Sequence, residues 1–403
     1  MTGSWGPPPA GPPQGAPGPW APPAAPPGQG MPPPPSPWPP PPGVPPGPYV
    51  PAPGQYAPSP ASYWQAPAPY GQVPVAYAPA GPPRFPRWSR QPHVVPTPYL
   101  HLLRTGNHRW WKPLLGIPLV AVLWLGAQLA VGIVIGLHVL VTGGTEQDFT
   151  RLLDGVGPGV LLLTNLTLAA AIPVTGVAVL VCHQERIGWL CSVLGRIRWR
   201  LLAGWTALAV ALMVVSAAVG VALPASAGGG LPALDPPPAG QLAALAAVFL
   251  LTTPLQAAGE EFLFRGYLAQ AIGSWIPPRV AALLVTAPIT ALLFAFAHGV
   301  QDPWLFADRF GFGIAAAVLV WLTGGLEASI ALHAVNNLFA FALSTLTGTL
   351  AEAVNVSEAP ASGVVLDLVG LTVFTVAVWL WTRRRPVARL SEAAAGGSFW
   401  SPR

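Results

Sequence analysis

Charged residues are scarce in this 403-residue chain: they make up 8% of it, against about 25% in soluble proteins. Hydrophobic residues reach 52%. This balance excludes an ordinary soluble globular protein and indicates a chain that is membrane-embedded, of low complexity, or both. Lysine is almost missing, because Lys112 is the one lysine among 19 basic residues. With abundant Ala, Pro and Gly, this arginine bias fits a GC-rich genome better than a nucleic-acid site, and we expect no nucleic-acid partner.

Cysteine is nearly absent as well. Cys182 and Cys191 are the only two, and they provide neither a disulfide framework nor the spacing of a metal site. Met1 leads into Gly and Pro rather than into a basic segment and an apolar run, so no signal peptide is expected.

Residues 1–98 contain no Asp, Glu or Lys, yet they hold 37 of the 54 prolines. Proline removes backbone donors and breaks helices, so we predict a disordered tail with polyproline II character. Two interpretations stay open. The tail is either a solubilising spacer or a docking segment for protein partners that bind proline-rich or self-associating sequences.

Apolar runs long enough to span about 30 Å recur after this tail. The expected fold is an all-α, polytopic membrane bundle of about eight transmembrane helices, with a disordered Pro-rich N-terminal tail. We expect the tail at 1–98, the bundle at 99–385 and a C-terminal tail at 386–403. The predicted spans are residues 114–137, 159–182, 201–223, 240–272, 280–299, 310–323, 326–346 and 363–382.

Ionisable groups at bilayer depth cost about 2.5–3.5 kcal/mol each on insertion scales, so they mark functional sites by default. The polar groups within or at the ends of the spans fall into three motifs. The fourth span carries a Glu-Glu pair and an Arg, the fifth ends in Phe-xxx-His, and the seventh holds His-xxx-Asn. The residues concerned are Glu260, Glu261, Arg265, Phe294, His298, His333 and Asn337.

Helical spacing assigns roles to these groups. Glu261 and Arg265 are four residues apart, so they share a helix face and are expected to pair. Glu260 points about 100° away from Glu261 and stays available for chemistry. Phe294 is expected to form an aromatic wall beside His298, which is also four residues away.

A carboxylate, two histidines and an amide suit hydrolysis by activated water. Glu260 can take a proton from water with help from His298, and His333 and Asn337 can donate to the oxyanion of a tetrahedral intermediate. The alternative is a divalent metal such as zinc held by Glu260, His298 and His333, since two His and one Glu are a known zinc set. The chain has no HExxH motif, which weighs against the metal.

Two further expectations concern the ends of the spans. Glu327 lies at the start of the seventh span, and we expect it to lie at the membrane–water interface. Glu260 lies 19 residues before Arg279 and His298 lies 19 residues after it, so an antiparallel hairpin would bring Glu260 and His298 to one level. The chain after His298 must still reach the outer side, so residues 299–311 are expected to form a broken or re-entrant segment.

The three motifs, in this order, resemble those of the CAAX-processing and bacteriocin-immunity (CPBP) family of intramembrane proteases. The family signature is EExxxR, then FxxxH, then HxxxN, and the likeness covers about residues 240–345. It implies a helical bundle with a cavity open to the cytoplasm and cleavage of a peptide bond in a membrane protein or peptide. Glu260 would be the base, His298 would hold the water, and His333 with Asn337 would bind the oxyanion.

The leading hypothesis is therefore an intramembrane endopeptidase that works on a membrane-associated substrate at the lipid bilayer. One alternative is a non-catalytic bacteriocin-immunity or scaffolding protein of the same fold. Another is a proton-coupled transporter that uses Glu260 and Glu261. The complete motif set favours the enzyme, and no convincing internal repeat supports the transporter.

Basic residues predict the orientation in the cell membrane. With eight spans, 16 Arg and Lys residues fall on the side of both termini and two, Arg151 and Arg309, on the other. The positive-inside rule then places both termini in the cytoplasm. A reporter fused after Arg403 should be active only in its cytoplasmic form. Activity of a periplasmic reporter at that position would contradict the eight-span topology.

Overall fold

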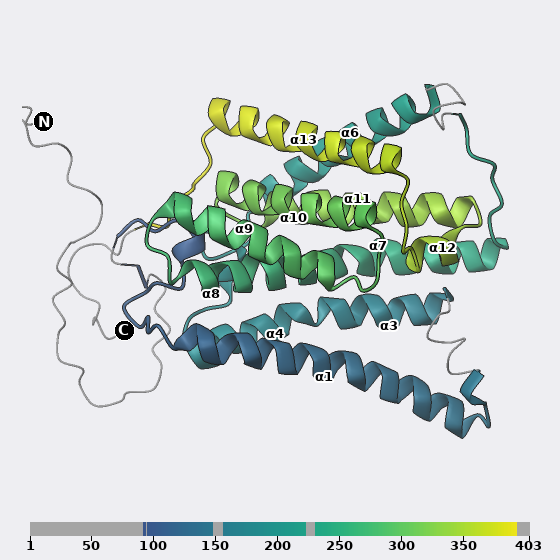
Figure 1. The fold of residues 1–403 in the computed structure, drawn as a ribbon, viewed down its shortest axis with the longest axis horizontal. Coiled ribbons are helices and arrows are strands. Elements are labelled where there is room, and N and C mark those ends of the chain that lie inside the picture. Colours follow the sequence, from purple (N-terminus) through teal and green to yellow (C-terminus); the bar gives the residue numbers. More distant parts are fainter. Residues whose placement is uncertain (1–91, 94, 148–155, 223–229, 393–403) are drawn as a thin grey trace, which may run out of the picture. The chain divides into compact units, whose positions relative to one another are not determined.

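The computed structural model describes residues 92–93, 95–147, 156–222 and 230–392, and every named element among these residues is a helix (Figure 1). Most of the predicted Pro-rich tail and the end of the C-terminal tail lie outside them. Within the described residues, eight helices are long and apolar enough to cross a membrane. Their elements are α1 (Lys112–Val141), α3 and α4 (Pro158–Ala169 and Ala171–Ala178), α6 (Trp199–Ala222), α7 and α8 (Ala239–Glu261 and Ala269–Gly273), α9 (Arg279–Phe296), α10 (Pro303–Thr323), α11 (Glu327–Leu346) and α13 (Ala361–Arg384).

The all-α fold and the eight predicted spans are confirmed, but the broken segment at 299–311 is wrong. The chain turns within residues 297–302, and α10 begins at Pro303. Asp302 caps this helix, because its Oδ1 accepts a hydrogen bond of 2.8 Å from the Leu305 amide. Proline at the first helical position needs no amide partner there. Together the cap and the proline start the sixth span about two turns earlier than hydropathy alone predicts.

Two short π-helical segments interrupt the spans. Val179–His183 closes the span of α3 and α4, and Phe262–Leu268 joins α7 to α8. Three small elements complete the described chain: a 3₁₀ turn at Tyr99–His101, α5 at Gly188–Cys191 and α12 at Leu350–Val354.

Helix α7 lies between α3 and α11, and it packs against both. Helix α6 also packs against α11, while α9 packs against α10 and α10 against α13. In Figure 1, α1 and α4 run side by side next to α3. Large apolar side chains along α1 are exposed, as expected for a surface that faces lipid.

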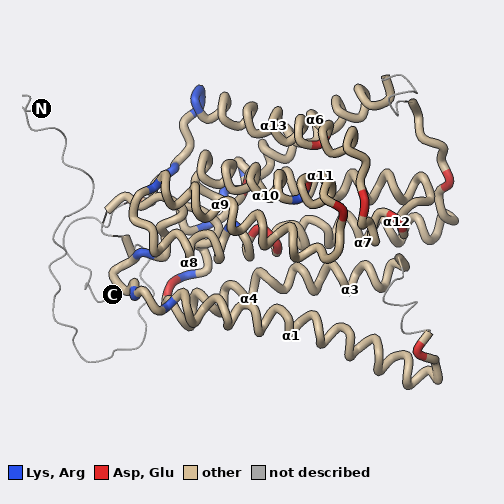
Figure 2. The backbone as a smooth tube through the Cα atoms, in the orientation of Figure 1, with Lys and Arg blue, Asp and Glu red and all other residues tan. Residues whose placement is uncertain are grey.

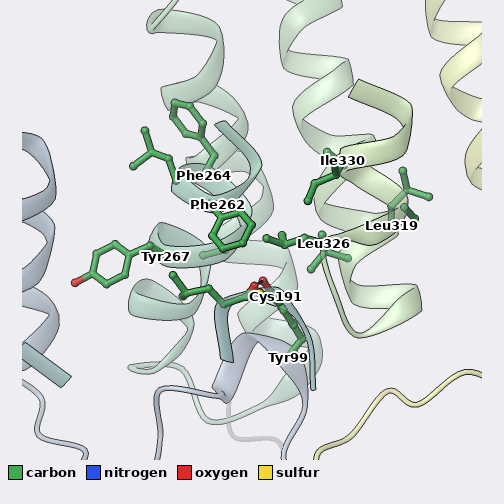
Figure 3. Packing of buried hydrophobic residues seen from close by; sticks show 14 of the residues in the cluster. Tyr99, Cys191, Phe262, Phe264, Tyr267, Leu319, Leu326 and Ile330 are labelled. Atoms are coloured by element: carbon green, nitrogen blue, oxygen red, sulfur yellow. Dashed lines mark hydrogen bonds between the residues drawn. The ribbon is translucent and has the colours of Figure 1, made fainter. Parts of the chain in front are cut away.

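Basic residues gather at the end of the bundle where α1 begins and α13 ends (Figure 2). The core near this end joins elements from distant parts of the sequence (Figure 3). Tyr99 and Cys191 pack with Phe262, Tyr267 and Leu326 in one buried cluster. The 3₁₀ turn before α1 is thus anchored against α8, the last part of the fourth span.

Glu327, which we expect at the membrane interface, is the first residue of α11 and is fully buried within the protein. Its carboxylate forms a two-pronged ion pair with Arg198, with Nε to Oε1 at 2.8 Å and Nη2 to Oε2 at 2.6 Å. Arg198 Nη1 also donates to the carbonyls of Thr323 and Ala388, at 3.0 and 3.1 Å. This Arg198 clamp ties the loop before α6, the α10–α11 junction and the segment after α13 together.

Breaking the Arg198 clamp should destabilise the bundle, because it leaves the Glu327 charge buried without a partner. Arg198→Ala should lower the free energy of unfolding by about 3–5 kcal/mol. Arg200→Ala is the matched control, since Arg200 is exposed two residues away. Thermal unfolding of both proteins in one detergent measures the difference, and equal midpoints for the two variants would disprove the role of the clamp.

Candidate functional site

The two glutamates stand where the fourth span changes its helical form. Glu260 and Glu261 are the last residues of α7, and the π-helical segment begins at Phe262. Single π-helical turns within α-helices are frequent at functional sites. Just before them, Gly259 allows α7 to approach α3 closely, because a Cβ there would lie 2.4 Å from the Leu168 carbonyl oxygen. The packing of α7 on α3 therefore fixes the depth of the glutamates.

Glu261 is the centre of a buried ionic cluster. Its Oε1 accepts from Arg265 Nη1 at 3.0 Å, across the one helical turn that the spacing predicts. The same oxygen lies 3.0 Å from Nδ1 of His333 on α11. Glu261 and Arg265 are completely buried. Because a carboxylate only accepts hydrogen bonds, this contact assigns the proton to Nδ1 and leaves His333 Nε2 directed elsewhere.

Phe294 forms the aromatic wall of the site. The Arg265 guanidinium lies 4.5 Å from the centre of its ring, at cation–π distance. The Phe294 ring is 4.7 Å from the His298 ring and 5.8 Å from the His333 ring, and Phe312 stacks on it at 5.6 Å. One side chain of α9 thus touches groups from all three motifs.

Glu260 faces a different set of partners. Its Oε1 accepts from the Gln256 side chain at 2.8 Å, and its Oε2 lies 3.5 Å from His333 Nε2. Oε2 is buried and accepts no hydrogen bond from the described residues. His333 therefore lies between the two glutamates, with Nδ1 on Glu261 and Nε2 towards Glu260.

Gln256 is a site residue that sequence reasoning missed. Its amide nitrogen holds Glu260, and its amide oxygen accepts from Asn337 Nδ2 at 3.1 Å. It links a carboxylate on α7 to an amide on α11. The sequence did hold a signal for Gln256, because it is a polar residue in an apolar run, one helical turn before Glu260.

His298 lies just past the end of α9. Its Nδ1 donates to the Phe294 carbonyl at 2.7 Å, which fixes the ring and leaves Nε2 as the nitrogen that can accept a proton. The ring interacts electrostatically with Glu260 and His333. The structure therefore brings the predicted residues of all three motifs into one region of the bundle.

The described part of the chain contains no set of ligands for the alternative metal site. No group of three or more His, Cys, Asp or Glu side chains there is placed to hold an ion. Glu260, His298 and His333 are accordingly not arranged as a metal centre, and we derive no step through a metal.

An apolar pocket of about 460 Å³ is lined by residues of α6, α7 and α11, none of which belongs to the three motifs. Val335 and Leu338 belong to its wall and flank Asn337 in the sequence. From there the pocket extends along α11 away from His333, as far as Leu346. This surface suits apolar chains, and on α11 it occupies a different face from the one that carries His333 and Asn337.

Comparisons with known proteins agree with the motifs. Residues 242–339 match the family model described as type II CAAX prenyl endopeptidase Rce1-like. A curated relative, the uncharacterized protein YyaK of Bacillus subtilis (strain 168), is 31% identical over 98 residues. That stretch is 24% of this chain and 32% of the relative, so the chain matches about a third of the relative's length. No solved structure matches the chain significantly. The resemblance to the CPBP family is thus confirmed for the segment that carries the three motifs, and this multi-pass membrane protein has an Rce1-like domain at residues 242–339.

Proposed function

We propose that the protein is an intramembrane endopeptidase that cleaves a membrane-associated peptide or protein with an activated water. One observation carries the proposal. The Glu260 carboxylate has one oxygen held by Gln256, while the other is buried without a hydrogen bond among the described residues and faces His333. A carboxylate held in this way is costly in an apolar bundle and suits a general base.

In this proposal Glu260 takes a proton from a water that His298 Nε2 helps to hold. The resulting hydroxide attacks the carbonyl carbon of the scissile bond, and the carbonyl oxygen becomes an oxyanion. Glu260 then returns the proton to the leaving nitrogen as the carbon–nitrogen bond breaks. The Glu261–Arg265 pair keeps a second negative charge neutralised nearby, so that Glu260 can remain the base.

His333 and Asn337 are the proposed oxyanion donors. The contact of Nδ1 with Glu261 orients the His333 ring, so Nε2 is the nitrogen that can face the substrate when it carries a proton. Asn337 Nδ2 bonds to Gln256 in this structure, and it would exchange that partner for the oxyanion. Catalytic hydrogen bonds often reach their final geometry only in the complex with substrate.

Substitution of Glu260 and substitution of Glu261 should have different effects on cleavage and on stability. Glu260→Gln should abolish cleavage while the protein stays folded, because an amide cannot accept the proton of water. Glu261→Gln should mainly lower stability, by about 3–5 kcal/mol, because it leaves the Arg265 charge buried with a weaker partner. Thermal unfolding reports the stability. Membrane proteomics of cells with wild-type or Glu260→Gln protein should show a fragment that disappears in the variant. Unchanged cleavage by Glu260→Gln protein would refute its role as the base.

The oxyanion donors can be tested with neighbouring asparagines. Loss of one such donor typically slows turnover by about 10²–10³-fold, so Asn337→Ala should do so with little change in substrate binding. Asn336→Ala is the matched control, because its side chain is exposed and points about 100° away. Purified proteins and a quenched peptide library give the rates, with a chelator added in a parallel series. If the two variants were slowed equally, the oxyanion site would not be where we place it.

A further inference from the structure

Arg309 is a charged side chain that none of the three motifs contains. It lies in the second turn of α10, within a span, and it is only partly exposed. An arginine in such a segment is costly and normally faces the interior of a bundle or a polar cavity. Its position therefore calls for a partner.

The chain positions Arg309 beside the end of α9. Its Nη1 donates to the Gln301 side-chain oxygen at 2.7 Å, and Gln301 Nε2 donates to the Ala295 carbonyl at 2.7 Å. Phe306 packs on Phe296 with ring centres 5.1 Å apart. Two side-chain contacts thus hold this face of α10 against the turn that carries His298.

Gln301 is held on the Ala295 carbonyl, next to the Phe294 carbonyl that holds the His298 ring, so the Arg309 guanidinium lies beside the turn that carries His298. Within the described chain it forms no ion pair of 4.0 Å or less, and the hydrogen bond to Gln301 uses one of its five donors. The adjacent Asp308 also interacts electrostatically with Arg309, but it lies too far away for an ion pair of 4.0 Å or less. The remaining donors of the fork are thus available to a ligand.

We propose that Arg309 is a substrate-binding residue, whose guanidinium binds a carboxylate of the peptide close to the scissile bond. Arginine pairs with carboxylates through two parallel hydrogen bonds, which fix orientation as well as charge. The carboxylate comes either from the C-terminus of the substrate or from an acidic side chain. This inference rests on the proposed peptidase function, since it assigns the specificity of the same site.

Binding tests the proposal apart from turnover. The protein is the full chain with Glu260→Gln, in lipid nanodiscs. The probes are one fluorescein-labelled apolar decapeptide of Ala, Leu and Val in three forms: with a free C-terminal carboxylate, as the C-terminal amide, and as the amide with one internal Glu. Fluorescence anisotropy gives the affinities. At least one carboxylate form should bind about 10- to 100-fold more tightly than the plain amide, the range expected of a hydrogen bond to a charged group. The form preferred identifies the source of the carboxylate.

Adding Arg309→Gln should remove this preference, and Arg309→Lys should retain a weaker one, because an ammonium lacks the fork. If the Gln variant does not fold, the Lys variant carries the test. Arg279→Gln is the matched control at the opposite end of α9, and it should keep the full preference. Equal binding of all three peptides, or a preference that survives Arg309→Gln, would overturn the proposal.

Turnover separates this proposal from the peptidase function. Quenched versions of the same peptides are given to protein with an intact Glu260. Cleavage with a lower KM for the carboxylate form supports both ideas. A binding preference without any cleavage would leave Arg309 as a carboxylate site and count against the peptidase. Cleavage of all forms with equal KM would leave the peptidase and refute the role of Arg309.

Discussion

The contact of Arg265 and His333 with one oxygen of Glu261 is the constraint on which the site depends. Three ionisable groups from two helices meet there at 3.0 Å, in a bundle whose surroundings cannot solvate a lone charge. Such a cluster can form only if α7 and α11 keep one register. The same contact turns the His333 ring so that its second nitrogen faces Glu260. A residue with no direct part in the proposed chemistry thus determines the geometry of those that have one.

The lengths of the helices decide where this cluster lies. α9 has 18 residues, whereas the fourth span runs for 35 residues from Ala239 to Gly273. The turn after α9 therefore ends beside the middle of the fourth span instead of beside its start. This mismatch brings His298, Gln301 and Arg309, which belong to the α9–α10 hairpin, to the level of the glutamates. If α9 and α10 were one or two helical turns longer, the polar loop between them would lie beside the apolar residues at the start of α7.

Sequence patterns predicted most of the fold because hydropathy and helix length are local properties. The pairing of Glu261 with Arg265 was equally accessible, since it is fixed by one helical turn. Three features could not be predicted from the sequence, because each depends on a partner from another part of the chain: the role of Gln256, the burial of Glu327 and the position of Arg309. The start of α10 was missed for a different reason. Its first two turns contain Asp308 and Arg309, which lower the hydropathy of a segment that Asp302 and Pro303 nevertheless start as a helix.

The two ends of the described chain meet next to the Arg198 clamp. Thr97 and Ser391 exchange hydrogen bonds across 294 positions, and Pro98 pairs with Leu390. A ribosome that adds roughly 5–20 residues per second needs about 15–60 s to make the chain between them. During that time Thr97 lacks its partner Ser391, and Arg198 lacks first Glu327 and then Ala388. These contacts can form only after Ala388 to Ser391 have been synthesised, so a chain cut short before Ala388 would leave the clamp incomplete.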